Sequence, residues 1–208
     1  MAAIKFFAQA AVMALVLTYI EKKCLPENIH AFLSSSSPAM SPAMFPRAFG
    51  LLILVLSGIS LWLISHSLSI GRSRLKYMEL ASKDGEAHVK ERYGLPNLYV
   101  EGVSKHARAF NCVQRSHQQT LESFPQFLFF SISASLCFPL TSTITCALWW
   151  YARVVWTNGY AKSEGDPAQR YSHPFSRFIW TGLLVQFLGS IMTALNILLS
   201  SNDNELFW

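Results

Sequence analysis

Phe110 to Pro125 reads Phe-Asn-Cys-Val-Gln-Arg-Ser-His-Gln-Gln-Thr-Leu-Glu-Ser-Phe-Pro and places polar groups ahead of an apolar run that continues to Phe138. At about 100° per helical residue, six of its polar side chains fall within one arc: Asn111, Gln114, Arg115, Gln118, Gln119 and Glu122. The opposite charges of Arg115 and Glu122 therefore share a helix face. Ionisable groups in membrane helices are costly and usually face the bundle interior or a wet cavity, where they find partners. This face is therefore a candidate binding site.

Hydrophobic residues make up 51% of the 208-residue chain, and charged residues only 14%. The charges come in patches between long uncharged stretches, which a water-soluble core of this size does not need. The net charge of +5 does not indicate nucleic-acid binding, because the bases cluster beside apolar runs without zinc-finger spacing or an aromatic and basic sheet motif. Composition and length therefore predict one domain of an integral membrane protein with no nucleic-acid partner. We expect neither a disulfide framework nor a metal site, because no CxxC pairing joins the four cysteines, Cys24, Cys112, Cys137 and Cys146.

Four apolar segments predict an all-α protein with four membrane-spanning helices: Phe49 to Ile70, Phe110 to Phe138, Thr141 to Tyr160 and Phe178 to Leu199. Pro139 leaves so short a connection that the second and third helices form a hairpin. The basic segments 71–109 and 161–177 then lie on one side of the membrane, which the positive-inside rule assigns to the cytosol.

Residues 1–48 precede this four-helix domain of residues 49–208. Lys5 and the apolar stretch from Phe6 to Ile20 suit either a cleaved signal peptide or a retained anchor, and the residues leave both open. The segment from Glu21 to Arg47 is rich in serine and proline, which predicts a linker without a long helix. The same composition also suits a bipartite mitochondrial or plastid targeting sequence.

A second polar stripe lies on the third predicted helix, where Arg153, Trp156 and Tyr160 are spaced by three and four residues. Arg153 lies deep in an apolar segment and needs a partner, for which Glu122 is a candidate. Arg170 follows in a turn-rich segment that places it at the cytosolic mouth of the bundle.

A purely structural interpretation of the same residues stands beside the binding-site interpretation. Arg115 and Glu122 then form a structural pair, Arg153 snorkels or caps a neighbouring helix, and Tyr160 is an interfacial anchor. His117 points away from the Arg115 and Glu122 arc, which favours a hydrogen bond between helices over a role as catalytic base.

The stretch Arg115-Ser-His-Gln-Gln119-Thr-Leu-Glu122-Ser-Phe-Pro125 resembles a family signature, Arg-x-His-x-Asn-x-Leu-Glu-x-x-Pro. It belongs to the membrane-associated proteins in eicosanoid and glutathione metabolism (MAPEG). Phe110-Asn-Cys-Val-Gln-Arg115, together with a second motif, looks most like the type 3 branch of the microsomal glutathione transferases. That motif contains Arg153, Gly159-Tyr160 and Gly165-Asp-Pro-x-x-Arg170, and the resemblance covers residues 49–199.

The resemblance implies a four-helix membrane protomer in a homotrimer, in the endoplasmic reticulum, with glutathione as co-substrate between subunits at the cytosolic side. By position, Arg115 would hold a glutathione carboxylate, Glu122 the glutamyl amino group and Tyr160 a further contact, while Arg170 would be the catalytic residue near the thiol. The other glutathione-binding residues by position are Gln119, Arg153 and Trp156. No metal is required.

The function that the resemblance implies is a glutathione transferase or peroxidase that acts on lipophilic electrophiles or lipid hydroperoxides from the bilayer. The sequence departs from the family pattern at Gln119, where Asn is usual, and at Trp156, where Tyr is common. The segment from Tyr160 to Gly165 is two residues longer than usual, and the arginine at the end of the first helix is either Arg74 or Arg92. These departures and the added N-terminal residues motivate the alternative of a non-catalytic, lipid-binding or structural subunit of a larger membrane complex.

Overall fold

The computed structural model describes residues 2–24, 26–29 and 47–199, and within these ranges the chain forms helices and turns but no strand. It divides into two compact units. The first unit is built from Met1–Gly58, Pro125–Trp150 and Phe178–Trp208, and the second unit from Ile59–Phe124 and Tyr151–Arg177.

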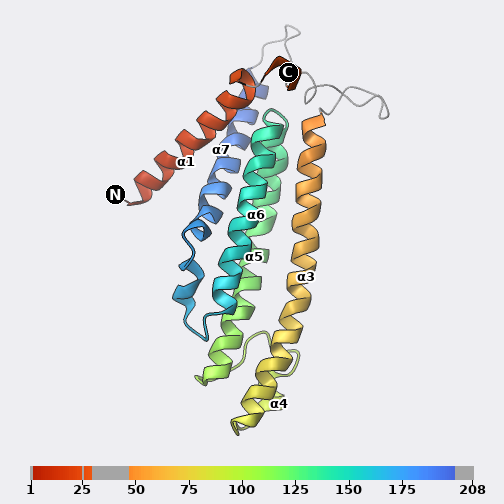
Figure 1. Cartoon of the computed structure of the whole chain (residues 1–208), viewed down its shortest axis with the longest axis vertical. Helices are drawn as coiled ribbons and strands as arrows, with labels where there is room; N and C mark the ends of the chain where they lie inside the picture. Colours follow the sequence, from red (N-terminus) through yellow and green to blue (C-terminus); the bar gives the residue numbers. More distant parts are fainter. Residues whose placement is uncertain (1, 25, 30–46, 200–208) are drawn as a thin grey trace. The chain divides into compact units, whose positions relative to one another are not determined.

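Five long helices and several shorter helical segments follow one another along the described chain (Figure 1). The long helices are α1 (Ala2–Tyr19), α3 (Arg47–Lys83), α5 (Lys105–Ser135), α6 (Pro139–Ala161) and α7 (Phe178–Leu199). The shorter segments include the π-helical turn η1 (Ile20–Cys24), α4 (Val89–Tyr93), and the 3₁₀ turns η2 (Pro167–Tyr171) and η3 (Pro174–Arg177). Helices α3, α5 and α6 each contribute residues to both units.

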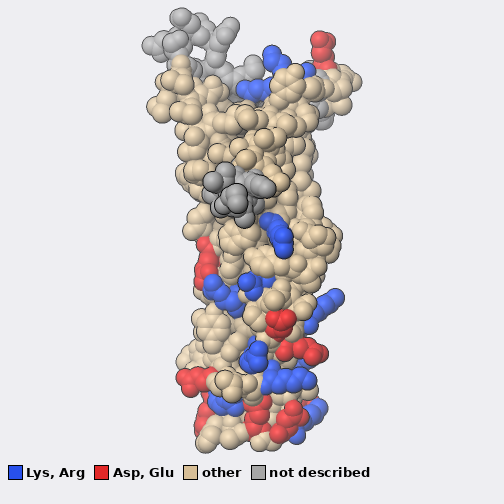
Figure 2. Space-filling view, turned by 90° about the vertical axis from the view of Figure 1, so that its left-hand side faces the viewer, with Lys and Arg blue, Asp and Glu red and all other residues tan. Residues whose placement is uncertain are grey.

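Two segments are long and apolar enough to cross a membrane, Arg47–Lys83 and Pro174–Leu199, when only the described residues are considered. On the face drawn in Figure 2, charged side chains gather over one part of the surface and leave another part without charge. The predicted second and third helices exist as α5 and α6, and only the residues Leu136 to Phe138 connect them. Polar residues at the start of α5 and within α6 lower the mean hydropathy of these two helices. The expectation that α5 and α6 also cross the membrane therefore stays a prediction.

Two helices extend into the basic segment 71–109, beyond the bounds predicted from the apolar runs Phe49 to Ile70 and Phe110 to Phe138. Helix α3 continues to Lys83, because residues 71–83 include strong helix formers and no proline, and it ends before Gly85, whose φ of +72° is left-handed. Helix α5 begins at Lys105 rather than Phe110, where the Ser104 hydroxyl accepts a 3.2 Å hydrogen bond from the Ala107 amide.

In the first unit, α1 runs beside α7 (Figure 1), and Ala10 and Ala14 form a buried cluster with Val185. The Glu21 carboxylate accepts hydrogen bonds from the backbone amides of Leu140 (2.7 Å) and Thr141 (2.8 Å). These are orphan donors of the first turn of α6, so a residue outside α6 caps that helix. The predicted serine- and proline-rich linker lies mostly outside the described residues.

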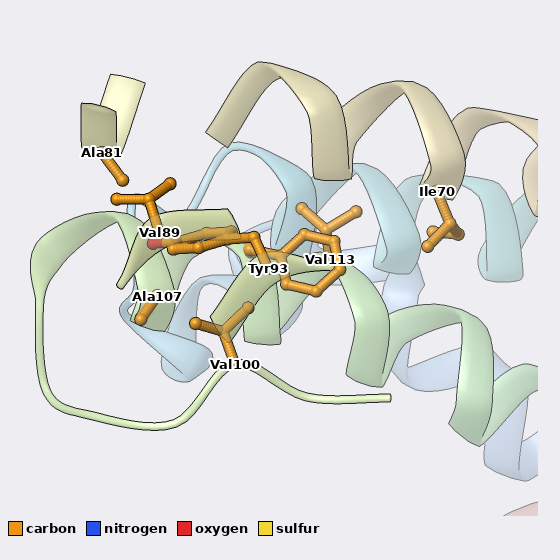
Figure 3. Close-up of a cluster of buried hydrophobic side chains, with 8 residues drawn as sticks. Ile70, Ala81, Val89, Tyr93, Val100, Ala107 and Val113 are labelled. Carbon is orange, nitrogen blue, oxygen red and sulfur yellow. The ribbon is translucent and has the colours of Figure 1, made fainter. Parts of the chain in front are cut away.

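In the second unit, a buried hydrophobic cluster joins the end of α3, the short helix α4 and the start of α5 (Figure 3). Tyr93 of α4 is fully buried, and its ring centre lies 6.4 Å from that of Phe110 on α5. Asn111 on α5 holds the preceding loop through two hydrogen bonds with the backbone of Val100, of 2.8 and 2.9 Å. These contacts fix the polar start of α5 relative to α3.

Candidate functional site

Arg115 and Glu122 form an exposed ion pair along α5. The Nη1 atom of Arg115 lies 2.9 Å from the Oε1 atom of Glu122, and the two side chains are 45% and 48% exposed. Two helical turns separate the residues, so the shared face predicted from the sequence is confirmed. An exposed pair of this kind contributes only about 0–1 kcal/mol. A ligand that carries its own carboxylate and ammonium groups can therefore replace it at little cost.

Arg153 is a buried cation on α6, with only 1% of its surface exposed. Its Nη1 atom donates to Oε1 of Gln119, and its Nη2 atom donates to Oγ of Ser123 at 2.9 Å. The centre of the guanidinium lies 5.2 Å from the Trp156 ring, in the range of a cation–π interaction. These two hydrogen-bond acceptors are neutral, so dipoles and an aromatic ring help to solvate the positive charge of Arg153.

This arrangement corrects the expectation that Glu122 is the partner of Arg153. Gln119 and Ser123 lie four residues apart on α5 and both reach Arg153, whereas the Glu122 carboxylate pairs with Arg115. Side chains at adjacent positions on a helix point about 100° apart, so Glu122 and Ser123 lie on different faces of α5. The sequence reasoning did not select Ser123, although its spacing from Gln119 was a usable signal.

The stripe on α6 continues from Trp156 to Tyr160, as predicted. The two rings meet edge to face with centres 4.8 Å apart, and both side chains are buried. The Cζ atom of Arg170 lies 5.6 Å from the Tyr160 ring and 4.9 Å from the Tyr171 ring. The structure thus places Arg153, Trp156, Tyr160 and Arg170 in one continuous series of contacts.

The turn η2 holds Arg170 in this position. The Asp166 side chain caps η2 by accepting from the Ala168 amide at 2.9 Å, and it also accepts from Gln169 Nε2 at 3.2 Å. These hydrogen bonds, the backbone one foremost, lower the pKa of the Asp166 carboxyl. Arg170 donates through Nη1 to the carbonyl of Pro167 within the same turn. A single turn of chain therefore orients the guanidinium.

Gly159 lets this turn approach α6. A Cβ atom at this position would lie 3.0 Å from the Cα atom of Arg170 and closer still to the carbonyl oxygen of Gln169. Glycine is needed because the backbone of η2 occupies the space of a side chain. The sequence reasoning named Gly159 only as part of a motif and gave it no role.

The two candidates for the arginine at the end of the first helix have different surroundings. The Arg74 guanidinium lies 4.6 Å from the Phe110 ring and donates to the carbonyl oxygens of Tyr93 and Leu98, at 3.0 and 3.2 Å. Arg92 instead binds the Glu101 carbonyl within the loop. Only Arg74 rests on a ring of α5, so it is the candidate associated with the signature helix.

His117 faces away from the Arg115 and Glu122 pair, as predicted from the helical arc. Its ring lies edge to face with that of His66 on α3, with centres 5.4 Å apart. The Nε2 atoms of both histidines are buried without a hydrogen-bond partner in the described structure. The predicted hydrogen bond between helices is not formed at the His117 Nε2 atom, and the contact with α3 in the described structure is aromatic.

A comparison with known families gives one match. Residues 52–195, more than half of the chain, match the model of the MAPEG family. The matched range contains every residue of the candidate site and leaves α1 outside. No solved structure matches the chain.

Proposed function

The chain belongs to the MAPEG family, and on this premise we propose that it is a glutathione transferase with glutathione peroxidase activity. Its second substrates would be lipophilic electrophiles or lipid hydroperoxides drawn from the bilayer. Family membership is consistent with a glutathione transferase or a related activity, and membership together with the two apolar helices supports a membrane protein.

The observation that carries the proposal is the position of Arg170 beside Tyr160. A free thiol titrates near pKa ~8.5, so most glutathione is protonated at neutral pH. A guanidinium beside the sulfur favours the thiolate, and each unit by which the thiol pKa falls corresponds to about 1.4 kcal/mol. Because η2 fixes the orientation of Arg170, that charge is already in place before glutathione binds.

The remaining site residues suit the polar ends of glutathione. The exposed pair of Arg115 and Glu122 offers a cation for a carboxylate and an anion for the glutamyl ammonium group. Arg153, held by Gln119 and flanked by Trp156, supplies a second, buried cation for a carboxylate or carbonyl oxygen.

The chemistry proceeds from the thiolate. In conjugation, its sulfur forms a bond to an electrophilic carbon, and the leaving group departs with the bonding electron pair. In peroxide reduction, two glutathione molecules are oxidised to the disulfide while the hydroperoxide becomes an alcohol and water. Arg170 would stabilise the negative charge on sulfur before either step.

We place the protein in the endoplasmic reticulum membrane as a homotrimer with glutathione between subunits, which extends its resemblance to the type 3 microsomal glutathione transferases. Mass photometry of the detergent-purified protein tests the assembly, and a particle mass other than that of three chains would contradict it. Fractionation that finds the protein in mitochondria or plastids would contradict the location.

Titration of the purified protein with glutathione tests the function, with heat release and ultraviolet thiolate absorbance followed together. We expect saturable binding with thiolate formation in the parent, and binding without thiolate in Arg170→Ala. Arg177→Ala is the matched control, because Arg177 is an exposed cation in the same connecting segment. Equal thiolate absorbance in the parent and in Arg170→Ala would overturn the role of Arg170.

One observation favours the alternative of a non-catalytic, lipid-binding or structural subunit. Arg115 pairs with Glu122, and Arg153 is bound by Gln119, so these groups already satisfy one another within the chain. The alternative predicts no heat of glutathione binding, together with stable association with a larger membrane complex in mild detergent. An active trimer isolated without partners would exclude it.

A further inference from the structure

A groove of about 690 Å³ lies between α1 and α7 in the first unit, and none of its lining residues belongs to the candidate site. This volume falls within the range of about 300–1,000 Å³ that is usual for small-molecule sites. Its walls are mainly apolar side chains: Leu15, Tyr19, Phe138, Met192, Leu195 and Leu199. Most of them are strongly exposed, with Leu15 at 58% and Leu195 at 50%.

The groove is built into the fold, because α1 is attached at two places. Ala10 and Ala14 are buried against α7, and Glu21 caps the first turn of α6 through two backbone amides. A carboxylate at a helix N-terminus also interacts favourably with the helix dipole. These contacts hold the end of α1 beside α7 and keep the groove open between them.

Two exposed lysines, Lys22 and Lys23, lie at one end of the groove. The Lys22 ammonium is 5.1 Å from the centre of the Phe138 ring, so its stem lies along the apolar wall. The neighbouring Glu21 carboxylate is directed to α6, where its oxygens accept hydrogen bonds from the amides of Leu140 and Thr141. The groove therefore combines a cationic end with an apolar length.

We propose that this groove binds one phospholipid with an anionic headgroup. Its phosphate would lie at Lys22 and Lys23, and an acyl chain would lie along Leu15 and Leu195. The bilayer around a membrane protein supplies such molecules, and each lysine near an anionic lipid headgroup contributes about 1 kcal/mol. No residue of this groove belongs to the proposed glutathione site, and the α1 side of the groove with its two lysines precedes the residues that match the family.

Native mass spectrometry of the detergent-purified full chain tests the proposal with dioleoyl phosphatidylglycerol and dioleoyl phosphatidylcholine as probes. The parent should retain phosphatidylglycerol in preference to phosphatidylcholine. The double variant Lys22→Gln/Lys23→Gln should lose about thirtyfold in phosphatidylglycerol affinity, from about 1 kcal/mol per lysine and a tenfold change per 1.4 kcal/mol. Its phosphatidylcholine binding should not change.

A control variant and a groove variant separate this site from general attraction to the protein surface. Lys90→Gln/Lys105→Gln removes the same charge from exposed positions in the second unit and should leave binding unchanged. Leu195→Trp keeps both lysines but fills the groove, and it should weaken phosphatidylglycerol binding as well. Thermal unfolding of each variant checks that the fold is retained.

Several results would overturn the proposal. One is equal phosphatidylglycerol affinity in the parent and in Lys22→Gln/Lys23→Gln, and another is an equal loss in the control variant. Displacement of phosphatidylglycerol by equimolar oleate would identify a fatty-acid site instead. Binding that occurs only after removal of residues 200–208, the acidic tail beyond Leu199, would show that the tail occupies the groove.

Discussion

Replacing Gln119 by leucine should destabilise the protein by removing an acceptor from a buried cation. The Arg153 guanidinium is 1% exposed and donates to Gln119 and Ser123. Leucine keeps nearly the same volume, so the main change is the loss of one hydrogen bond to a charged group, which costs about 1.5–3 kcal/mol. For a chain of this size, 1 kcal/mol shifts the unfolding temperature by about 2–4 °C. A loss of about 2 kcal/mol therefore lowers it by about 4–8 °C.

Thermal unfolding in detergent, followed by intrinsic tryptophan fluorescence, measures this shift. Arg115→Gln is the control, because it breaks an ion pair that is about half exposed and should cost no more than about 1 kcal/mol. In the double variant Gln119→Leu/Arg153→Met, no buried cation is left short of an acceptor. Its cost should therefore fall below the sum of the two single costs by about 1 kcal/mol or more.

Two results would refute this reasoning. Unfolding of Gln119→Leu within about 1 °C of the parent would mean that Gln119 does not solvate the Arg153 charge. Additive costs in the double variant would mean that the two side chains contribute independently.

Three further predictions concern a helix cap, a close approach and a titrating side chain. Glu21→Gln should lower stability by about 1–2 kcal/mol, because the charged cap of α6 is lost, and chemical unfolding measures it. Gly159→Ala should push η2 away from α6 and reduce glutathione thiolate absorbance through displacement of Arg170, with little change in helix content by circular dichroism. The lowered pKa of Asp166 gives a stabilising contribution that is complete above its ordinary value of 3.8 and is lost as the pH falls through the folded-state value. The stability difference between the parent and Asp166→Asn should therefore shrink on acidification, and a difference independent of pH would contradict this.

The helices and their polar faces follow from local patterns in the sequence. Phe178 to Leu199 is helical as predicted, because an uninterrupted apolar run of that length has few alternatives. The tight connection before Pro139 and the stripe from Arg153 to Tyr160 were also predicted, because proline position and helical periodicity are local properties. The extension of α3 to Lys83 was missed because polarity alone does not end a helix.

The pairing of side chains between helices could not be predicted in the same way. Glu122 and Gln119 lie three positions apart on one helix, and a small rotation of that helix decides which of them reaches the Arg153 cation. Coulomb attraction alone favours the Glu122 carboxylate over the neutral Gln119 amide as the partner of Arg153. In the structure, the Glu122 carboxylate instead stays paired with Arg115 on the more exposed side of α5, and it does not enter the buried surroundings of Arg153.

By itself, the sequence determined an all-helical, apolar chain with a signature helix, since composition and period need no knowledge of the neighbours. Only the tertiary structure decided that Gln119 and Ser123 solvate Arg153, that Gly159 seats the turn carrying Arg170, and that Glu21 caps a helix more than a hundred residues away. The physical reason is that hydrogen bonds act over about 3 Å, whereas residue spacing fixes only the direction in which a side chain leaves its own helix.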